Sequence, residues 1–125
     1  MVKTLISTIV AVLLFAFGAL FEYKFIDKSF NEFDDRLSVL YEKSESKDAT
    51  IDDVLSVQQF WIKSKKSLHT VIPHTEIKEI DLWLSEAVRL TEQYNFDEAM
   101  QKIEVLRELC EQIPTTFKLK FENIF

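Results

Sequence analysis

The most conspicuous pattern in the chain is an apolar run near its start. Thr4 to Phe21 holds eighteen residues without a charge, eleven of them Leu, Ile, Val or Phe, between Lys3 and Glu22. At 1.5 Å per residue a helix of this length covers about 27 Å, close to the roughly 30 Å hydrocarbon layer of a bilayer. On the insertion scale those eleven side chains contribute about −3 to −6 kcal/mol together. The pattern therefore predicts one membrane-spanning helix.

Two alternatives to a membrane anchor are a cleaved signal peptide and the buried helix of a soluble protein. A cleavage site needs small residues at positions −3 and −1, and Ala16-Phe17-Gly18 offers one such pair among bulky neighbours. The run also continues into helix-compatible sequence without a breaker, which favours an uncleaved anchor. Lys3 and the amino terminus, set against Glu22 and Lys24, favour a cytoplasmic N-terminus. We therefore expect the rest of the chain outside the cytoplasm.

After the run, apolar residues recur at steps of four and three, which draws one stripe along a helix that continues the membrane helix. This stripe consists of Ile26, Phe30, Phe33, Leu37 and Leu40. Its two Phe residues suit a globular bundle better than a two-stranded coiled coil. The polar stretch from Glu42 to Asp53 predicts a loop, in which Thr50 is expected to cap the next helix.

Three further amphipathic segments predict three more helices. The second runs from about Ile51 to Val71, and Pro73 ends it. The third runs from His74 or Thr75 to about Tyr94, where Asn95 is expected to adopt left-handed geometry. The fourth starts near Phe96 and is kinked at Pro114. The expected stripes are Ile51, Val54, Leu55, Trp61, Ile62, Leu68 and Ile72; Ile77, Ile80, Leu84, Ala87, Thr91 and Tyr94; and Ala99, Met100, Ile103, Leu106, Cys110 and Ile113. Phe117, Phe121 and Ile124 continue the last stripe in phase, so we expect the C-terminal turn to pack on the bundle.

Composition agrees with an all-α fold. One Gly and two Pro in 125 residues are too few for the turns of a β-rich protein. We expect residues 1–21 to form a transmembrane anchor and residues 22–125 to form a small antiparallel bundle of about four helices. Without Lys3 the chain has 14 basic and 21 acidic residues, a net charge of −7, so we expect neither nucleic acid nor an anionic lipid surface as a partner. Its single Cys excludes an internal disulfide.

Residue types that carry catalysis are poorly grouped in this sequence. His69 and His74 are the only histidines, and no Cys, His or carboxylate accompanies them at the spacings of a zinc site. Cys110 occupies a stripe position and is expected to be a core residue. There is no Gly-rich phosphate loop and no Cys-His or Ser-His arrangement. We therefore expect no enzyme activity, no metal and no cofactor.

The remaining candidate residues are three aromatic residues and one lysine. Lys65 lies between Trp61 and Leu68 on the apolar face, so it either pairs with a carboxylate such as Glu86 or lays its stem over Trp61 and lifts its ammonium to water. The second arrangement is preferred.

Two functions are compatible with these features. The first is a structural or interaction protein that binds an envelope or membrane partner. The second is a module in which a gap between helices, lined by Trp61, Trp83 and Tyr94, holds a small apolar ligand. A contiguous internal pocket would favour the ligand, and a filled core with an exposed apolar groove would favour the partner.

A set of patterned residues along the chain resembles a known family. These residues are Trp61, Lys65, Ile72, His74, Ile77, Ile80, Leu84, Ala99, Leu106, Leu109, Ile113 and the ending Phe121-Glu122-Asn123-Ile124-Phe125. The chain is similar to the small bacterial membrane proteins of domain-of-unknown-function family 4363, although it has Phe121 where that family's ending has Leu. The resemblance implies an N-terminal span and a helical domain. It implies no catalytic residue, because the family has no assigned activity.

Overall fold

The computed structural model describes residues 1–124, with the side chains of residues 121 and 124 outside the description. It contains four helices: α1 (Val2–Glu45), α2 (Ile51–Leu68), α3 (His74–Glu92) and α4 (Phe96–Ile124). No strand occurs in this part of the chain. The predicted all-α bundle of four helices is therefore confirmed.

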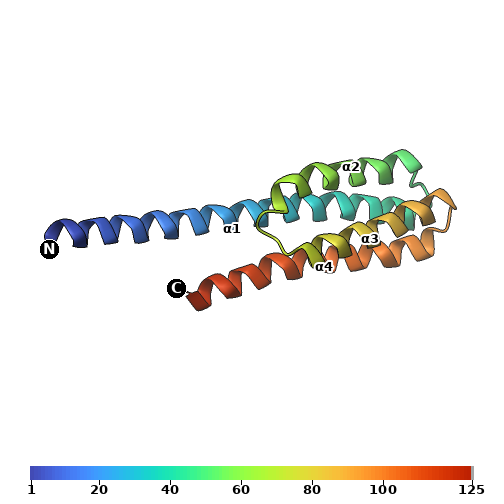
Figure 1. Ribbon diagram of the computed structural model, residues 1–125. Coiled ribbons are helices and arrows are strands. Elements are labelled where there is room, and N and C mark those ends of the chain that lie inside the picture. Colours follow the sequence, from blue (N-terminus) through green and yellow to red (C-terminus); the bar gives the residue numbers. More distant parts are fainter. Residues whose placement is uncertain (125) are drawn as a thin grey trace.

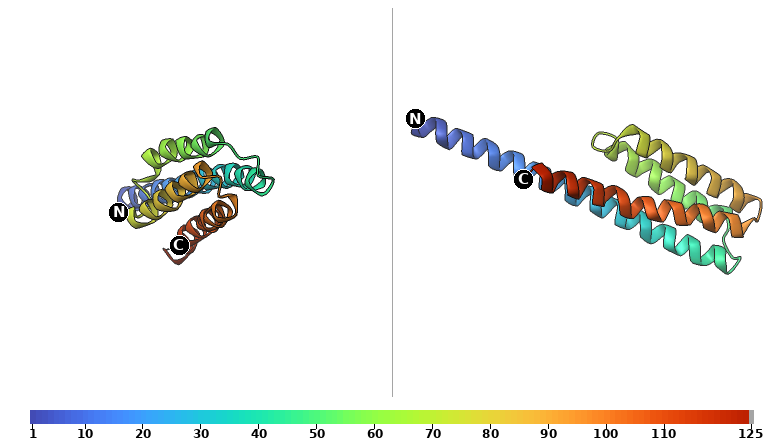
Figure 2. Two further views of the ribbon diagram at one scale, coloured as in Figure 1. Left: turned by 90° about the vertical axis from the view of Figure 1, so that its right-hand side faces the viewer. Right: turned by 90° about the horizontal axis from the view of Figure 1, so that it is seen from below.

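Successive helices run in alternating directions, up-down-up-down (Figure 1). α1 packs beside α2 and α4, and α3 packs beside the same two helices. The closest packing joins α4 to α1 and to α3, whereas α2 is held less closely by its neighbours. Both views in Figure 2 show α4 running alongside α1. The loops after α1 and α3 lie at one end of the bundle, and the loop after α2 lies at the end from which α1 protrudes.

The core forms where the four apolar stripes meet. Every member of the predicted α1 stripe, from Ile26 to Leu40, is at most 2% exposed. Trp61 of α2 fills the centre, with its ring centroid 5.3 Å from that of Phe33 and 6.3 Å from that of Phe30. The other helices contribute Val54, Val57 and Leu68; Ile77, Ile80, Leu84 and Ala87; and Ala99, Ile103, Leu106, Leu109, Cys110 and Ile113.

The N-terminal half of α1 protrudes from the bundle (Figure 1). Its most apolar window has a mean hydropathy of 2.4, and none of that window is buried. By length and composition α1 is the one helix of the described chain able to cross a membrane, a property that an N-terminal signal sequence shares. The apolar segment and the bundle belong to the same unbroken helix, since α1 continues from Val2 to Glu45.

The loop between α1 and α2 is shorter than the predicted range of Glu42 to Asp53, because α1 continues to Glu45 and α2 begins at Ile51. Thr50 caps α2 as predicted. Its hydroxyl accepts from the backbone N–H of Asp53 at 3.2 Å, and the Asp53 carboxylate accepts from the backbone N–H of Thr50 at 2.9 Å. These two bonds form a reciprocal capping box.

Two predicted helix ends are wrong. α2 stops at Leu68 instead of Val71, and α3 stops at Glu92 instead of Tyr94. Tyr94, with φ of 59°, takes the left-handed geometry expected of Asn95. The reason is that the Asn95 side chain caps α4, accepting from the backbone N–H of Glu98 at 3.4 Å.

Five residues of the predicted stripes lie outside the core, and two of them, Ile62 and Met100, are half-buried. Ile51, Leu55 and Tyr94 are exposed. In α2 the buried face instead follows Val54, Val57 and Trp61.

α4 continues through Pro114 to Ile124 without a break, as the resumed stripe predicted. After the proline, the hydroxyls of Thr115 and Thr116 donate to the carbonyl oxygens of Glu111 and Gln112 at 2.8 and 2.9 Å. Phe117 packs partly buried against the core. The predicted packing of Phe121 and Ile124 lies outside the described side chains.

The capping box at α2 predicts a pH-dependent stability. Hydrogen bonds from the Thr50 backbone N–H and from Lys43 hold the pKa of Asp53 below its ordinary value of 3.8. Because the pKa is lower in the folded state, this stabilisation is present above about pH 4 and is lost as pH falls through the lowered pKa. We expect Thr50→Ala to lower the free energy of unfolding by about 1 kcal/mol at pH 7. We expect Asp53→Asn to weaken the acid dependence.

Urea denaturation between pH 7 and pH 3, followed by circular dichroism, measures both effects. Asp52→Asn is the matched control, since Asp52 is exposed and lies outside the capping box. An acid dependence that is the same in the Asp53→Asn variant and in the unchanged protein would contradict the assignment.

Candidate functional site

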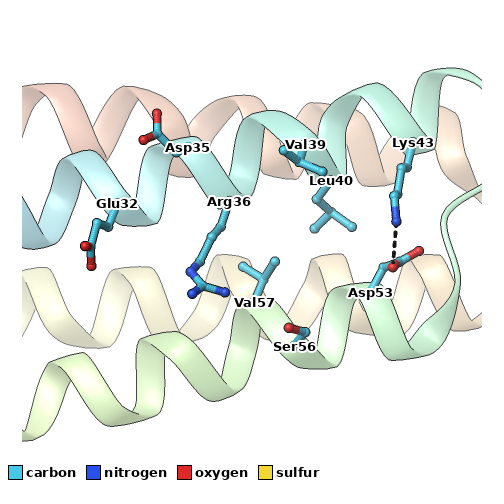
Figure 3. A pocket seen from close by; sticks show the side chains of 9 residues that line it. All are labelled: Glu32, Asp35, Arg36, Val39, Leu40, Lys43, Asp53, Ser56 and Val57. Carbon is cyan, nitrogen blue, oxygen red and sulfur yellow. Dashed lines mark hydrogen bonds and ion pairs between the residues drawn. The ribbon is translucent and has the colours of Figure 1, made fainter.

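A groove of about 450 Å³ runs between α1 and α2 (Figure 3). It is lined by Glu32, Asp35, Arg36, Val39, Leu40, Lys43, Asp53, Ser56 and Val57. Next to the groove, large rings pack between the two helices: Phe33 of α1 stacks on Phe60 of α2 at 6.2 Å between centroids and meets Trp61 at 5.3 Å. Beyond these rings α2 presents Ser56 and Val57, which are too short to fill the same space.

Charged residues surround an apolar floor in this groove. Lys43 pairs with Asp53 at 3.0 Å and closes one end. Arg36 points into the groove (Figure 3), with its guanidinium 4.3 Å from the centroid of Phe60. Among the described residues Arg36 has no carboxylate partner, so its donors are available to a ligand. Val39 contributes apolar surface and is 54% exposed.

A second groove, of about 400 Å³, lies between α1 and α4. Arg107 donates to Asp34 at 2.9 Å, and the Tyr41 hydroxyl donates to Glu104 at 2.9 Å, a bond that raises the pKa of Tyr41. Cys110 also lines this groove, but it is buried, and that burial raises the pKa of its thiol far above the ordinary value. A thiol held protonated in this way is a poor nucleophile.

Trp61 and Lys65 share a partner that the sequence did not indicate. The indole N–H of Trp61 donates to Asp81 at 2.7 Å, and the Lys65 ammonium lies 3.2 Å from the same carboxylate. Lys65 is therefore paired, contrary to the preferred expectation that its ammonium points to water. The proposed partner Glu86 is also wrong, because Glu86 pairs with Lys102 at 3.5 Å.

The three aromatic residues expected around a ligand pocket do not converge. Trp61 is buried in the core. Trp83 is half-buried on α3 and is covered by Lys102 of α4, whose ammonium lies 5.0 Å from the ring centroid. Tyr94 is 79% exposed beyond the end of α3, where it meets Phe96 edge-on. The structure therefore offers no apolar gap lined by all three side chains.

Metal-binding residue types are dispersed in residues 1–124. No group of three or more His, Cys, Asp or Glu side chains there is placed to hold a metal ion. His69 is exposed, with its Nδ1 2.6 Å from the carbonyl oxygen of Lys66, and His74 is exposed at the start of α3.

The α1–α2 groove escaped the sequence analysis. Most of its lining residues on α1, such as Arg36 and Val39, lie outside the predicted apolar stripe. From the sequence they are indistinguishable from ordinary surface residues. The one available signal was Val39, an apolar residue between the stripe positions Leu37 and Leu40.

The fold is that of a small all-α protein whose helical bundle shares its first helix, α1, with an exposed apolar segment. Residues 20–124 match the domain of unknown function DUF4363. The chain therefore belongs to that family, and the resemblance seen in the sequence is confirmed. No curated protein and no solved structure matches the chain at a significant level.

Proposed function

We propose that this chain is a single-pass membrane protein whose helical bundle binds another envelope or membrane protein without catalysing a reaction. The observation that carries the proposal is the continuity of α1. Its first part exposes apolar side chains all around, which favours an apolar environment such as lipid, and its buried face begins only at Ile26. One helix thus joins a segment suited to a bilayer to a folded domain.

The same continuity supports an anchor over a cleaved signal peptide. The small residues of the candidate cleavage site lie inside an unbroken helix. Ala19, just after that site, lines a hollow together with Phe117 of α4. Cleavage after Gly18 would leave all residues of this hollow in the chain, so the support for an anchor rests on the continuity of α1 alone.

The packing favours a protein partner over a small apolar ligand. Core side chains such as Trp61, Phe33 and Leu37 are at most 1% exposed, and the α1–α2 groove opens on the surface with exposed charges at its rim. This is a filled core with a partly apolar external groove. Val39 and Arg36 offer an apolar contact and a free donor side by side, a combination found in protein interfaces.

Site-specific photo-crosslinking in cells tests the proposal. A photoreactive amino acid at Val39 places the probe in the groove. The matched control is Leu82, which is 57% exposed on α3, away from the groove. We expect one reproducible membrane or envelope protein to be crosslinked from position 39 and not from position 82.

Two other outcomes of the crosslinking experiment would contradict different parts of the proposal. Absence of any protein crosslink from position 39, with the variant folded and in the membrane, would reject the partner. Equal crosslinking from both positions would reject the groove as the binding surface.

The bundle is proposed to face the outside of the cytoplasm, since Lys3 and the amino terminus favour a cytoplasmic N-terminus. Protease added to intact protoplasts should then remove the bundle. Full protection, with digestion only after lysis, would reverse the orientation.

A further inference from the structure

The last turns of α4 extend past the bundle alongside the apolar part of α1. The red end of α4 passes beyond the ends of α2 and α3 in Figure 1, on the side of the bundle from which α1 protrudes, and it diverges from α1 toward the C-terminus. Phe117 and Lys120 line a hollow of about 420 Å³ together with Ala19, Glu22 and Tyr23 of α1. Phe117 is therefore level with the end of the predicted span.

The remaining residues of α4 reach further toward the N-terminus of α1. The two helices are antiparallel, and the seven steps from residue 117 to residue 124 advance about 10 Å at 1.5 Å per residue. A bilayer of about 40 to 45 Å with a hydrocarbon core of about 30 Å has a headgroup layer of about 5 to 8 Å on each side. When α1 spans the membrane, Lys118 to Lys120 therefore lie within about 5 Å of the level of Phe21, where the hydrocarbon meets the headgroup layer, and the backbone of residue 124 lies deeper.

The exposed side chains at this end suit the headgroup layer. Leu119 is 55% exposed, and Lys118 and Lys120 flank it, both exposed. The Lys120 ammonium lies 5.7 Å from the ring centroid of Phe117. Against these two positive charges stands Glu122 alone in this stretch, although the whole chain has a net charge of −6. Long lysine stems can cover apolar surface while their ammonium groups reach phosphate.

We propose that residues 117–120 of α4 form a second membrane contact, in which Leu119 lies at the inner edge of the headgroup layer and Lys118 and Lys120 bind lipid phosphates. This contact rests on the proposed membrane anchor. A single membrane helix leaves the bundle free to tilt relative to the membrane. A second contact would restrict that tilt, which the anchor alone does not do.

Depth-dependent fluorescence quenching of the full-length chain tests the contact. Single cysteines replace Leu119, Leu82 or Leu13, each is labelled with an environment-sensitive fluorophore, and the protein is reconstituted in phosphatidylcholine vesicles containing phosphatidylglycerol. Cys110 is retained, since its buried thiol, with its raised pKa, resists labelling. Leu82 is the matched control because it is 57% exposed and lies about 20 Å further from the membrane, judged from the short α3–α4 turn.

We expect a lipid with a nitroxide on its headgroup to quench the label at position 119 several-fold more strongly than the label at position 82. A nitroxide on the acyl chain should quench the label at position 13. Equal headgroup quenching at 119 and 82, with position 13 quenched, overturns the second contact and leaves the anchor in place. No quenching at position 13 overturns the anchor and the second contact together.

A charge variant tests the role of the lysines. Lys118→Gln with Lys120→Gln should reduce the headgroup quenching at position 119 and raise its accessibility to acrylamide several-fold. Lys63→Gln with Lys66→Gln removes two lysines from α2 and should leave both readouts unchanged. An unchanged signal in the α4 variant overturns the assignment of these lysines to lipid phosphates.

Discussion

Two lysines in the apolar part of α1 are expected to release the protein from membranes. Val10→Lys combined with Leu13→Lys raises the insertion free energy by about 6 to 8 kcal/mol, more than the about 3 to 6 kcal/mol that the segment supplies. Both side chains are exposed in the structure, so the two substitutions should not lower the stability of the bundle. Carbonate extraction of cell membranes, followed by immunoblotting, should move the variant from the pellet to the supernatant.

The matched control places the same two lysines on the bundle. Val39→Lys combined with Leu82→Lys changes positions that are 54% and 57% exposed and lie far from the apolar segment. This variant should stay in the pellet. Retention of the α1 variant in the carbonate-resistant pellet would show that this segment does not hold the protein in the membrane.

Truncation of Trp61 is expected to be the most damaging single change in the core. Trp61 is 1% exposed and packs against Phe30 and Phe33. Trp61→Ala should lower the free energy of unfolding by about 3 to 5 kcal/mol, which corresponds to a fall in Tm of about 15 °C or more for a domain of this size. Thermal denaturation in detergent, followed by circular dichroism, measures it.

Two companion variants separate the causes. Trp61→Phe keeps most of the ring packing and loses the hydrogen bond to Asp81, so its effect should be smaller. Trp83→Ala removes a half-buried ring covered by Lys102, and we expect a loss of less than about 2 kcal/mol. Equal destabilisation by Trp61→Ala and Trp83→Ala would refute a core centred on Trp61.

The stripe of α1 could be predicted because a helix repeats its buried face every three to four residues. Ile26, Phe30 and Leu37 belong to the core for that reason alone. The cap at Thr50 was predictable as well, since capping depends on residues three apart in sequence. Features set by neighbours in the chain were therefore accessible.

Features that depend on how one helix is displaced along its neighbour could not be predicted from the sequence. The sequence favoured a Lys65 ammonium in water and offered Glu86 as the alternative partner, yet Lys65 pairs with Asp81, which lies on α3 five residues before Glu86. Helical periodicity places both carboxylates on α3 but does not say how far α3 slides along α2. That offset is fixed by the turn before Pro73 and by the packing of the core.

The candidate groove was hidden for a related reason. It lies beside the packed rings of Phe33, Phe60 and Trp61, where α2 presents the short side chains of Ser56 and Val57. A pattern of apolar and polar positions records where side chains are buried. It does not record how much space is left between two helices.

The unbroken course of α1 makes it a stiff mechanical lever. From Phe21 to Glu45 the helix contains neither proline nor glycine, and its 24 steps span about 36 Å. When the span tilts by about 20°, a usual angle for a membrane helix, the far loop at residues 46–50 swings sideways by about 12 Å. In the proposed anchor, a tilt of α1 is thereby converted into a displacement of the outer tip of the domain, and the second contact proposed for α4 would limit that displacement.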